Sequence, residues 1–149
     1  MQNKGKILKV VVALMIAAQM LSAAIDITAK FTDPYFKAKV YWEIEKTSPA
    51  AILDSDVSDI TRLYLYVGMI TSLTGIEYFT ALTSLNCSGN QLTTLDVSKN
   101  AAMEVLSCSN NQLTELDVSK NTKIIYLNVT NNYFTGEDKI SAWTNQQLL

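Results

Sequence analysis

A repeat of 21 residues constrains this chain more than any other feature of its sequence. Residues 82–102 read LTSLNCSGNQLTTLDVSKNAA, and residues 103–123 read MEVLSCSNNQLTELDVSKNTK, so most positions match at a fixed offset. A third copy starts at residue 124 with IIYLNVTNNYFT, and residues 60–81 form a less regular copy with a 22-residue step. A period of this length is typical of solenoids, in which each copy forms one coil that stacks on the next.

The copies follow the pattern L-x-x-L-x-L-x-x-N-x-L of a leucine-rich repeat. Side chains alternate around Leu85, Leu106 and Leu127, which predicts one short strand per coil with its leucine inside. A second alternation, LDVS, sends leucine and valine inward from the opposite side of each coil. We therefore predict an α/β leucine-rich-repeat solenoid of about four coils at residues 60–135, with short parallel strands on its concave face.

Asn90, Asn111 and Asn132 stand where the chain leaves each predicted strand. An asparagine amide has both donors and an acceptor, so it can pair backbone groups that a tight turn leaves without partners. Asparagine side chains also bond to nearby backbone more often than to ligands. We therefore predict that these three residues form a structural ladder.

Residues 1–24 have the three zones of a secretory signal peptide. Three lysines precede the apolar run Val10–Ala18, and small residues follow up to Ala24. We predict cleavage after Ala24, with the bond after Ala23 as the near alternative. An uncleaved membrane anchor is the other interpretation, but Gln19 interrupts the apolar run well before the ~18 residues that a membrane-spanning helix needs.

Residues 25–59 are predicted to form an N-terminal helical cap and a lead-in to the repeats. Asp33 suits the N-cap position and Pro34 suits the first helical position. The helix that follows carries apolar residues at four-residue spacing, at Phe36, Val40 and Ile44. Because the first coil of a solenoid otherwise exposes its core, we expect this stripe to cover it. A partner-binding helix is the alternative interpretation.

Residues 136–149 are predicted to form either a short C-terminal cap or a truncated tail. Glu137 falls where the repeat has a leucine, so the pattern breaks there. The candidates for covering the last coil are Ile140, Trp143, Leu148 and Leu149. An uncovered coil would present a strand edge and apolar surface, which favours weak self-association through the C-terminal edge.

The composition excludes several classes of function. The chain has 149 residues and no histidine, which rules out hydrolases with a catalytic imidazole and histidine-ligated zinc sites. It has 12 basic and 14 acidic residues, and removal of residues 1–24 leaves nine basic residues and a net charge of −5. We therefore expect no nucleic acid partner. No phosphate-binding loop or other catalytic motif is present, which predicts a non-enzymatic protein without a cofactor.

An acidic group at Asp54, Asp56 and Asp59 begins like a calcium-binding loop. However, Asp59 stands where an EF-hand loop has glycine, and Leu65 stands where the loop has its bidentate glutamate. We therefore predict no metal site, with a weak calcium contact as the alternative.

Cys87 and Cys108 occupy the same position in adjacent copies, so their Cα atoms should lie about 4.8 Å apart. The corresponding positions of the other copies hold Leu65 and Val129, which indicates an apolar site in the core. Parallel strands in register also point both side chains the same way, which is unfavourable for a disulfide. We favour two buried free thiols over a disulfide, although the predicted secretion would permit oxidation.

The outward side chains of the four predicted strands form the candidate binding surface. We name these residues the sheet-face ribbon: Arg62, Tyr64, Tyr66, Ser84, Asn86, Ser88, Val105, Ser107, Ser109, Tyr126, Asn128 and Thr130. All except Ser84 and Val105 are candidate partner-binding residues. The ribbon has a single charge and three tyrosines, which combine a rigid apolar ring with a polar tip. The alternative interpretation is that tyrosine simply favours exposed strand positions.

The copies resemble the tandem LxxLxCSxNQLTxLDVSKN units of secreted bacterial leucine-rich-repeat proteins. The segment TSLTGIEYFTALTSL is similar to the internalin-type repeats of surface adhesins. The resemblance covers about residues 31–135. It implies the leucine-rich-repeat fold and says little about the ligand.

These features together predict a secreted or cell-surface module that binds a protein or a glycan through its concave face, with no membrane span after signal cleavage. The alternative is a structural spacer, or a fragment of a longer bacterial surface protein, without a ligand site of its own. A standard interface uses about 20–30 residues per partner, and the ribbon has 12. We therefore expect this chain alone to bind weakly.

Overall fold

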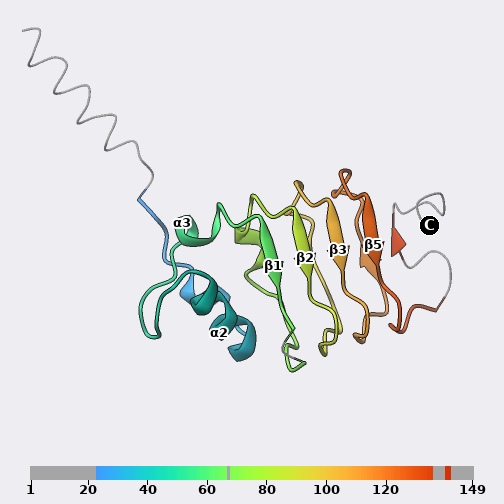
Figure 1. Cartoon of the computed structure of the whole chain (residues 1–149), viewed down its shortest axis with the longest axis horizontal. Helices are drawn as coiled ribbons and strands as arrows, with labels where there is room; N and C mark the ends of the chain where they lie inside the picture. The colour runs from blue at the N-terminus through green and yellow to red at the C-terminus, as the bar shows by residue number, and fades with distance from the viewer. Residues whose placement is uncertain (1–22, 67, 136–139, 142–149) are drawn as a thin grey trace, which may run out of the picture.

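The computed structural model describes residues 23–66 and 68–135 and the backbone of 140–141 (Figure 1). The predicted signal peptide lies outside the described residues except at Ala23 and Ala24, and the predicted cover residues Trp143, Leu148 and Leu149 also lie outside them. Among the described residues, no helix has the length and apolar character needed to cross a membrane.

The described part of the chain begins with short helices and continues with a series of short strands. They are η1 (Thr28–Lys30), α2 (Pro34–Glu43), α3 (Asp54–Val57), β1 (Arg62–Tyr64), η2 (Ile76–Tyr78), β2 (Ser84–Asn86), β3 (Val105–Ser107), β4 (Leu116–Asp117), β5 (Tyr126–Asn128) and β6 (Ile140–Ser141), where η marks a 3₁₀-helix.

Four of the strands form one parallel sheet in the order β1-β2-β3-β5, drawn as neighbouring arrows in Figure 1. Leu63 pairs with Leu85, Leu85 with Leu106, and Leu106 with Leu127. The paired residues are 22 positions apart between β1 and β2 and 21 apart afterwards, which are the offsets of the sequence repeat. The predicted α/β solenoid with one short parallel strand per coil is confirmed.

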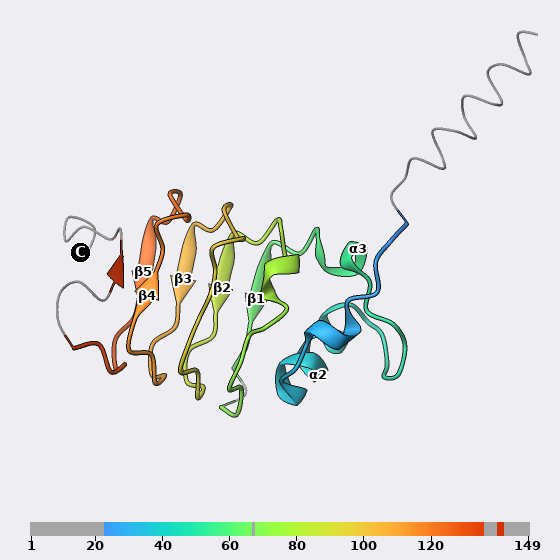
Figure 2. The ribbon, with the colours of Figure 1, turned by 180° about the vertical axis from the view of Figure 1, so that it is seen from behind.

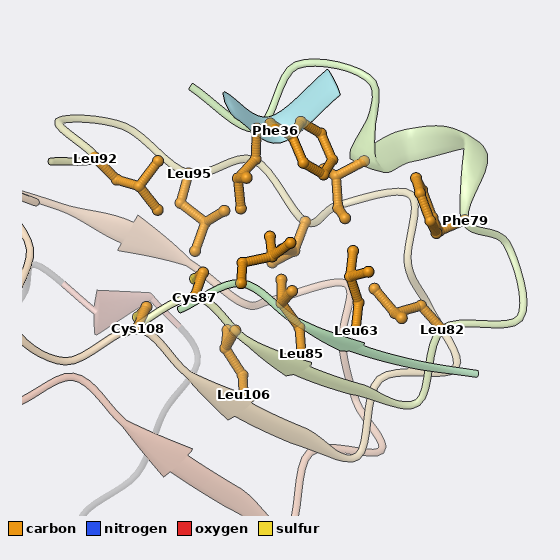
Figure 3. Packing of buried hydrophobic residues seen from close by; sticks show 14 of the residues in the cluster. Phe36, Leu63, Phe79, Leu82, Leu85, Cys87, Leu92, Leu95, Leu106 and Cys108 are labelled. Carbon is orange, nitrogen blue, oxygen red and sulfur yellow. The ribbon is translucent and has the colours of Figure 1, made fainter. Parts of the chain in front are cut away.

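A continuous apolar core runs through the coils behind this sheet (Figure 3). The strand leucines are buried in it: Leu63, Leu85, Leu106 and Leu127. The LDVS segments on the opposite side add buried leucines and valines: Leu95, Val97, Leu116 and Val118. Burial of one such side chain contributes about 1.5–3 kcal/mol, so the stacked core is a main source of stability.

Cys87 and Cys108 are buried in this core as free thiols, as the sequence favours. Cys87 Sγ donates a hydrogen bond to the backbone oxygen of Ser107 at 3.6 Å. Burial raises the pKa of Cys87 well above its ordinary value, and the adjacent Cys108 raises it further. Burial also raises the pKa of Cys108 to about 12. Both thiols therefore remain protonated at neutral pH.

Asn90, Asn111 and Asn132 repeat one hydrogen-bond pattern at the ends of the strands. Asn111 Nδ2 donates to the backbone oxygens of Cys87 and Cys108, each at 3.0 Å, and its Oδ1 accepts from the backbone N–H of Leu92 at 3.0 Å. The other two residues make the equivalent bonds in the coils before and after. Each amide therefore bonds to its own coil and to the preceding coil.

A second asparagine ladder lies on the other side of the coils, and the sequence analysis did not predict it. Asn100 Nδ2 donates to the backbone oxygens of Ile76 and Phe79 at 2.9 and 3.0 Å. Asn121 Nδ2 donates to those of Val97 and Asn100 at 2.8 and 3.0 Å. Both asparagines are buried. Their recurrence at a 21-residue offset was the available signal.

Helix α2 begins where the sequence predicts, with Asp33 as its N-cap and Pro34 as its first residue. Asp33 Oδ1 accepts from the backbone N–H groups of Tyr35 and Phe36, each at 2.9 Å. Asp33 Oδ2 accepts from the backbone N–H and the hydroxyl of Thr71, both at 2.8 Å. Burial alone would raise the pKa of Asp33, but these hydrogen bonds lower it. The cap residue therefore also ties the helix to the first coil.

The helix lies beside β1 and packs into the same core (Figure 2). Phe36 contacts Phe31 and Phe79, with ring centroids 5.5 and 6.3 Å away. Gly75, with φ of 107°, lies against Phe31, where a Cβ atom would come within 2.6 Å of the ring. Glycine is therefore required at this position. Ile44, the third residue of the predicted stripe, is only partly buried, and the capping role of the helix stays a prediction.

Strand pairing continues beyond residue 135, where the sequence predicts that the repeats end. β6 pairs in parallel with β4, and Ile140 lies opposite Leu116. This offset of 24 residues is three longer than the repeat, so Ile140 takes the position that the 21-residue period assigns to Glu137.

The first ladder predicts a large effect of a single substitution. Asn111→Ala removes the partners of three buried backbone groups, so we expect it to lower the free energy of unfolding by about 3 kcal/mol. Gln112→Ala, at the adjacent exposed position, should change it by less than about 0.5 kcal/mol. Urea unfolding followed by circular dichroism measures both, and equal effects of the two substitutions would contradict the structural role.

The buried thiols predict a dependence of stability on pH. In the folded protein both pKa values lie above the unfolded value of about 8.5. The thiols therefore contribute stability that is fully present below pH ~8.5 and is lost as the pH rises toward 12. A variant with Cys87→Val and Cys108→Val, which uses the residue present at Val129, should lose less stability over this range.

A thiol reagent tests the same cysteines directly. At pH 8 we expect it to react slowly with the folded protein, because thiolate is the reactive form, and with two thiols per chain after unfolding without reductant. Fast reaction in the folded state, or no reactive thiol after unfolding, would contradict this account.

Candidate binding surface

The sheet-face ribbon lies on the side of the four-stranded sheet opposite the core. Strand pairing aligns its residues in rows across the sheet, one from each strand. The first row is Arg62, Ser84, Val105 and Tyr126, and the second is Tyr64, Asn86, Ser107 and Asn128. Neighbouring strands lie about 4.8 Å apart, so each row spans about 14 Å.

The two tyrosines of the first coil form an ordered aromatic pair. Tyr64 and Tyr66 expose 45% and 67% of their surface, and their rings are stacked with centroids 6.2 Å apart and planes inclined by 14°. Asn86 Nδ2 donates to Tyr66 Oη at 2.8 Å, and Asn86 Oδ1 accepts from the backbone N–H of Ser88 at 3.0 Å. Asn86 therefore holds the Tyr66 ring in position from the adjacent strand.

The middle of the ribbon differs from the expectation, because Ser107 and Ser109 are buried and expose only 9% and 6% of their surface. Their hydroxyls bond to Ser88 Oγ at 2.9 and 3.0 Å. Both hydroxyls therefore have a hydrogen-bond partner within the ribbon itself. Both serines were predicted to contact a partner, and their burial makes Ser88 the more accessible hydroxyl of the three.

The far end of the ribbon presents a third tyrosine. Tyr126 on β5 exposes 51% of its surface. It lies in the same row as Arg62, and β5 is three strands away from β1, which carries Tyr64. Asn128 Oδ1 accepts from the backbone N–H and the hydroxyl of Thr130 at 3.1 and 2.9 Å. The structure thus places Arg62 and Tyr64 on β1, with Tyr66 just after this strand, and separates all three from Tyr126.

Three large apolar side chains of the repeat coils that do not belong to the ribbon are exposed, and they were not predicted as candidates. Met69, Ile125 and Tyr133 are at least half exposed. In the adjacent copies the positions of Ile125 and Tyr133 hold Glu104 and Gln112. An apolar residue that replaces a polar one at an exposed repeat position was the signal that could have identified them.

The acidic group at the start of the repeats is engaged in local bonds. Asp54 Oδ1 accepts from the backbone N–H of Ile25 and of Ser55 at 2.9 and 2.8 Å. Asp56 forms an ion pair with Lys46. Burial alone would raise the pKa of Asp56, but the hydrogen bonds from Lys46 and the Leu53 backbone lower it. No group of three metal-ligating side chains occurs among the residues that the structure describes.

Comparisons with known proteins agree with this architecture. The family model described as Leucine Rich Repeat matches residues 81–100. Internalin J of Listeria monocytogenes serotype 4b (strain F2365) is 38% identical over 70 residues, which make up 47% of this chain and 8% of that protein.

Two solved structures from Listeria monocytogenes are similar to most of the chain. The functional domain of InlJ, described as including a cysteine ladder, has a TM-score of 0.69 and 36% identity, and the match covers 77% of this chain and 26% of that one. The internalin inlF has the same TM-score at 23% identity, with 78% and 35% coverage, and shows the fold alone. This chain therefore spans a minor part of each relative. It has the leucine-rich-repeat fold and is similar in sequence to internalin J over its repeats.

Proposed function

We propose that this chain is a secreted or surface-exposed, non-catalytic binding module, and that it recognises a protein or a glycan through the sheet-face ribbon. The ordered tyrosine pair of β1 is the observation that carries the proposal. Tyr64 and Tyr66 present stacked rings to solvent, although an apolar core lies on the other side of the sheet. Aromatic side chains and arginine are the residues that contribute most to binding at protein interfaces.

The rigidity of this pair supports the same proposal. The hydrogen bond from Asn86 to Tyr66 and the contact with Tyr64 limit the movement of both rings. A side chain that is already ordered loses little conformational entropy when a ligand binds, so more of the contact energy contributes to affinity. A tyrosine that is exposed only because tyrosine favours strand positions would not need a hydrogen-bond partner that orders its ring.

The charge of the ribbon restricts the kind of ligand. Arg62 is its single charged residue, and the other polar groups are hydroxyls and amides. Long-range electrostatic attraction therefore contributes little, and binding depends on ring contacts and neutral hydrogen bonds. A surface of this size corresponds to a weak interaction for the isolated chain.

The proposal predicts that three tyrosines account for ligand binding. We expect Tyr64→Ala, Tyr66→Ala and Tyr126→Ala together to weaken the Kd at least tenfold, because truncation of an aromatic residue that dominates an interface costs about 2 kcal/mol or more. Tyr35→Ala with Trp42→Ala, which removes exposed aromatic residues of α2, is the matched control and should leave the Kd unchanged.

The measurement starts from arrays of purified extracellular proteins and of glycans, probed with the secreted chain. Each reproducible ligand is then titrated against both variants by calorimetry, with circular dichroism to verify folding. Equal loss of affinity in the two variants, or full affinity in the triple variant, contradicts binding through the ribbon. Arrays without any reproducible ligand favour the structural-spacer alternative.

A further inference from the structure

The first residue of the folded domain is fixed by a carboxylate. The backbone N–H of Ile25 donates to Asp54 Oδ1 at 2.9 Å, and the backbone N–H of Asp54 donates to the Ile25 oxygen at 2.9 Å. The pairing continues with a bond from Ile27 N–H to the Ile52 oxygen at 2.8 Å. Ala23 and Ala24, which precede this segment, are exposed coil. Regular bonding of the described chain therefore begins at Ile25.

Ile25 is also the first residue after the cleavage site that the sequence alone predicts. The order of basic, apolar and small residues in 1–24 predicts a signal peptidase site between Ala24 and Ile25. We propose that the Ala24–Ile25 bond is the processing site, and that the Asp54 carboxylate binds the α-ammonium group that cleavage creates on Ile25. The inference is independent of the ligand-binding function proposed above.

The covalent step is a hydrolysis. One water molecule cleaves the C–N bond between the Ala24 carbonyl carbon and the Ile25 nitrogen, so that its hydroxyl joins the carbon and its hydrogen joins the nitrogen. At neutral pH the new amine takes up a proton and the new carboxyl group loses one. The same nitrogen atom that now donates one N–H to Asp54 then carries three hydrogens and a positive charge.

The surroundings of this nitrogen suit a cation. Asp54 and Glu77 line one pocket together with Ala24, the residue before Ile25. Asp26 lies next in the chain, and its carboxylate bonds to the backbone and hydroxyl of Thr28. On α3, Asp56 neutralises Lys46. The new amino group therefore has three acidic residues around it, and the basic residue Lys37 lies close enough to Asp26 to lower the pKa of that carboxylate.

The change of charge strengthens an existing bond. The acceptor of this bond is already ionised, and cleavage adds a positive charge on the donor, so a direct attraction between opposite charges is gained. It also favours the protonated amine, so the pKa of the Ile25 amino group should lie above its ordinary range of about 7.7–8.0. The stabilisation is then fully present below pH ~7.7 and is lost as the pH rises through the raised pKa.

The test uses the full chain, expressed in a bacterial host that secretes it. Mass spectrometry of the secreted protein should give Ile25 as the first residue. NMR titration of the Ile25 Cα resonance should then give an amino pKa about half a unit or more above the ordinary range. Asp54→Asn should return the pKa to the ordinary range, whereas Asp59→Asn, a nearby exposed acidic residue, should leave it raised.

A second measurement needs no variant. At 1 M salt the screening length falls to about 3 Å, so the pKa of the wild-type amino group should move toward its ordinary value. A secreted chain that begins at any other residue overturns the processing site. An amino pKa that is not raised, or that neither Asp54→Asn nor salt lowers, overturns the role of Asp54.

Discussion

Each coil of this solenoid turns tightly enough to leave buried backbone groups that no strand can pair, and the pairing of these groups governs the whole structure. Asparagine meets the requirement because one amide supplies two donors and an acceptor. Asn111 spans two coils in this way, and Asn121 bonds two backbone oxygens on the opposite side. The leucine core can therefore stack without the cost of about 1–3 kcal/mol for each unpaired buried group.

Much of this architecture could be predicted because the chain repeats. A fixed period gives the parallel register of Leu85 and Leu106 directly, and an aspartate before a proline gives the start of α2. The extent to which an individual side chain is buried could not be predicted. Alternation places Ser107 on the outer face, but only the structure shows that this residue is buried and that its hydroxyl bonds to Ser88. The pairing of Ile140 with Leu116 departs from the period, so no repeat argument could give it.

The ladders also explain why binding is proposed for the open face of the sheet. Because asparagines and leucines fulfil the structural requirements of each coil, the outward strand positions are free to vary. The chain uses this freedom unevenly, with tyrosines on the outer strands β1 and β5 and short, mostly polar side chains between them. Asn86 contributes to the surface itself, since it orders the Tyr66 ring from the neighbouring strand.

Native-state hydrogen exchange tests the central role of the asparagine ladder most directly. The backbone N–H groups of Ile70, Leu92 and Leu113 lie in the turns after the strands and donate to asparagine Oδ1 atoms. If these bonds hold the coils together, the three amides should exchange only through global unfolding, as slowly as the amides of the strands. Exchange as fast as that of exposed turn amides would contradict the account.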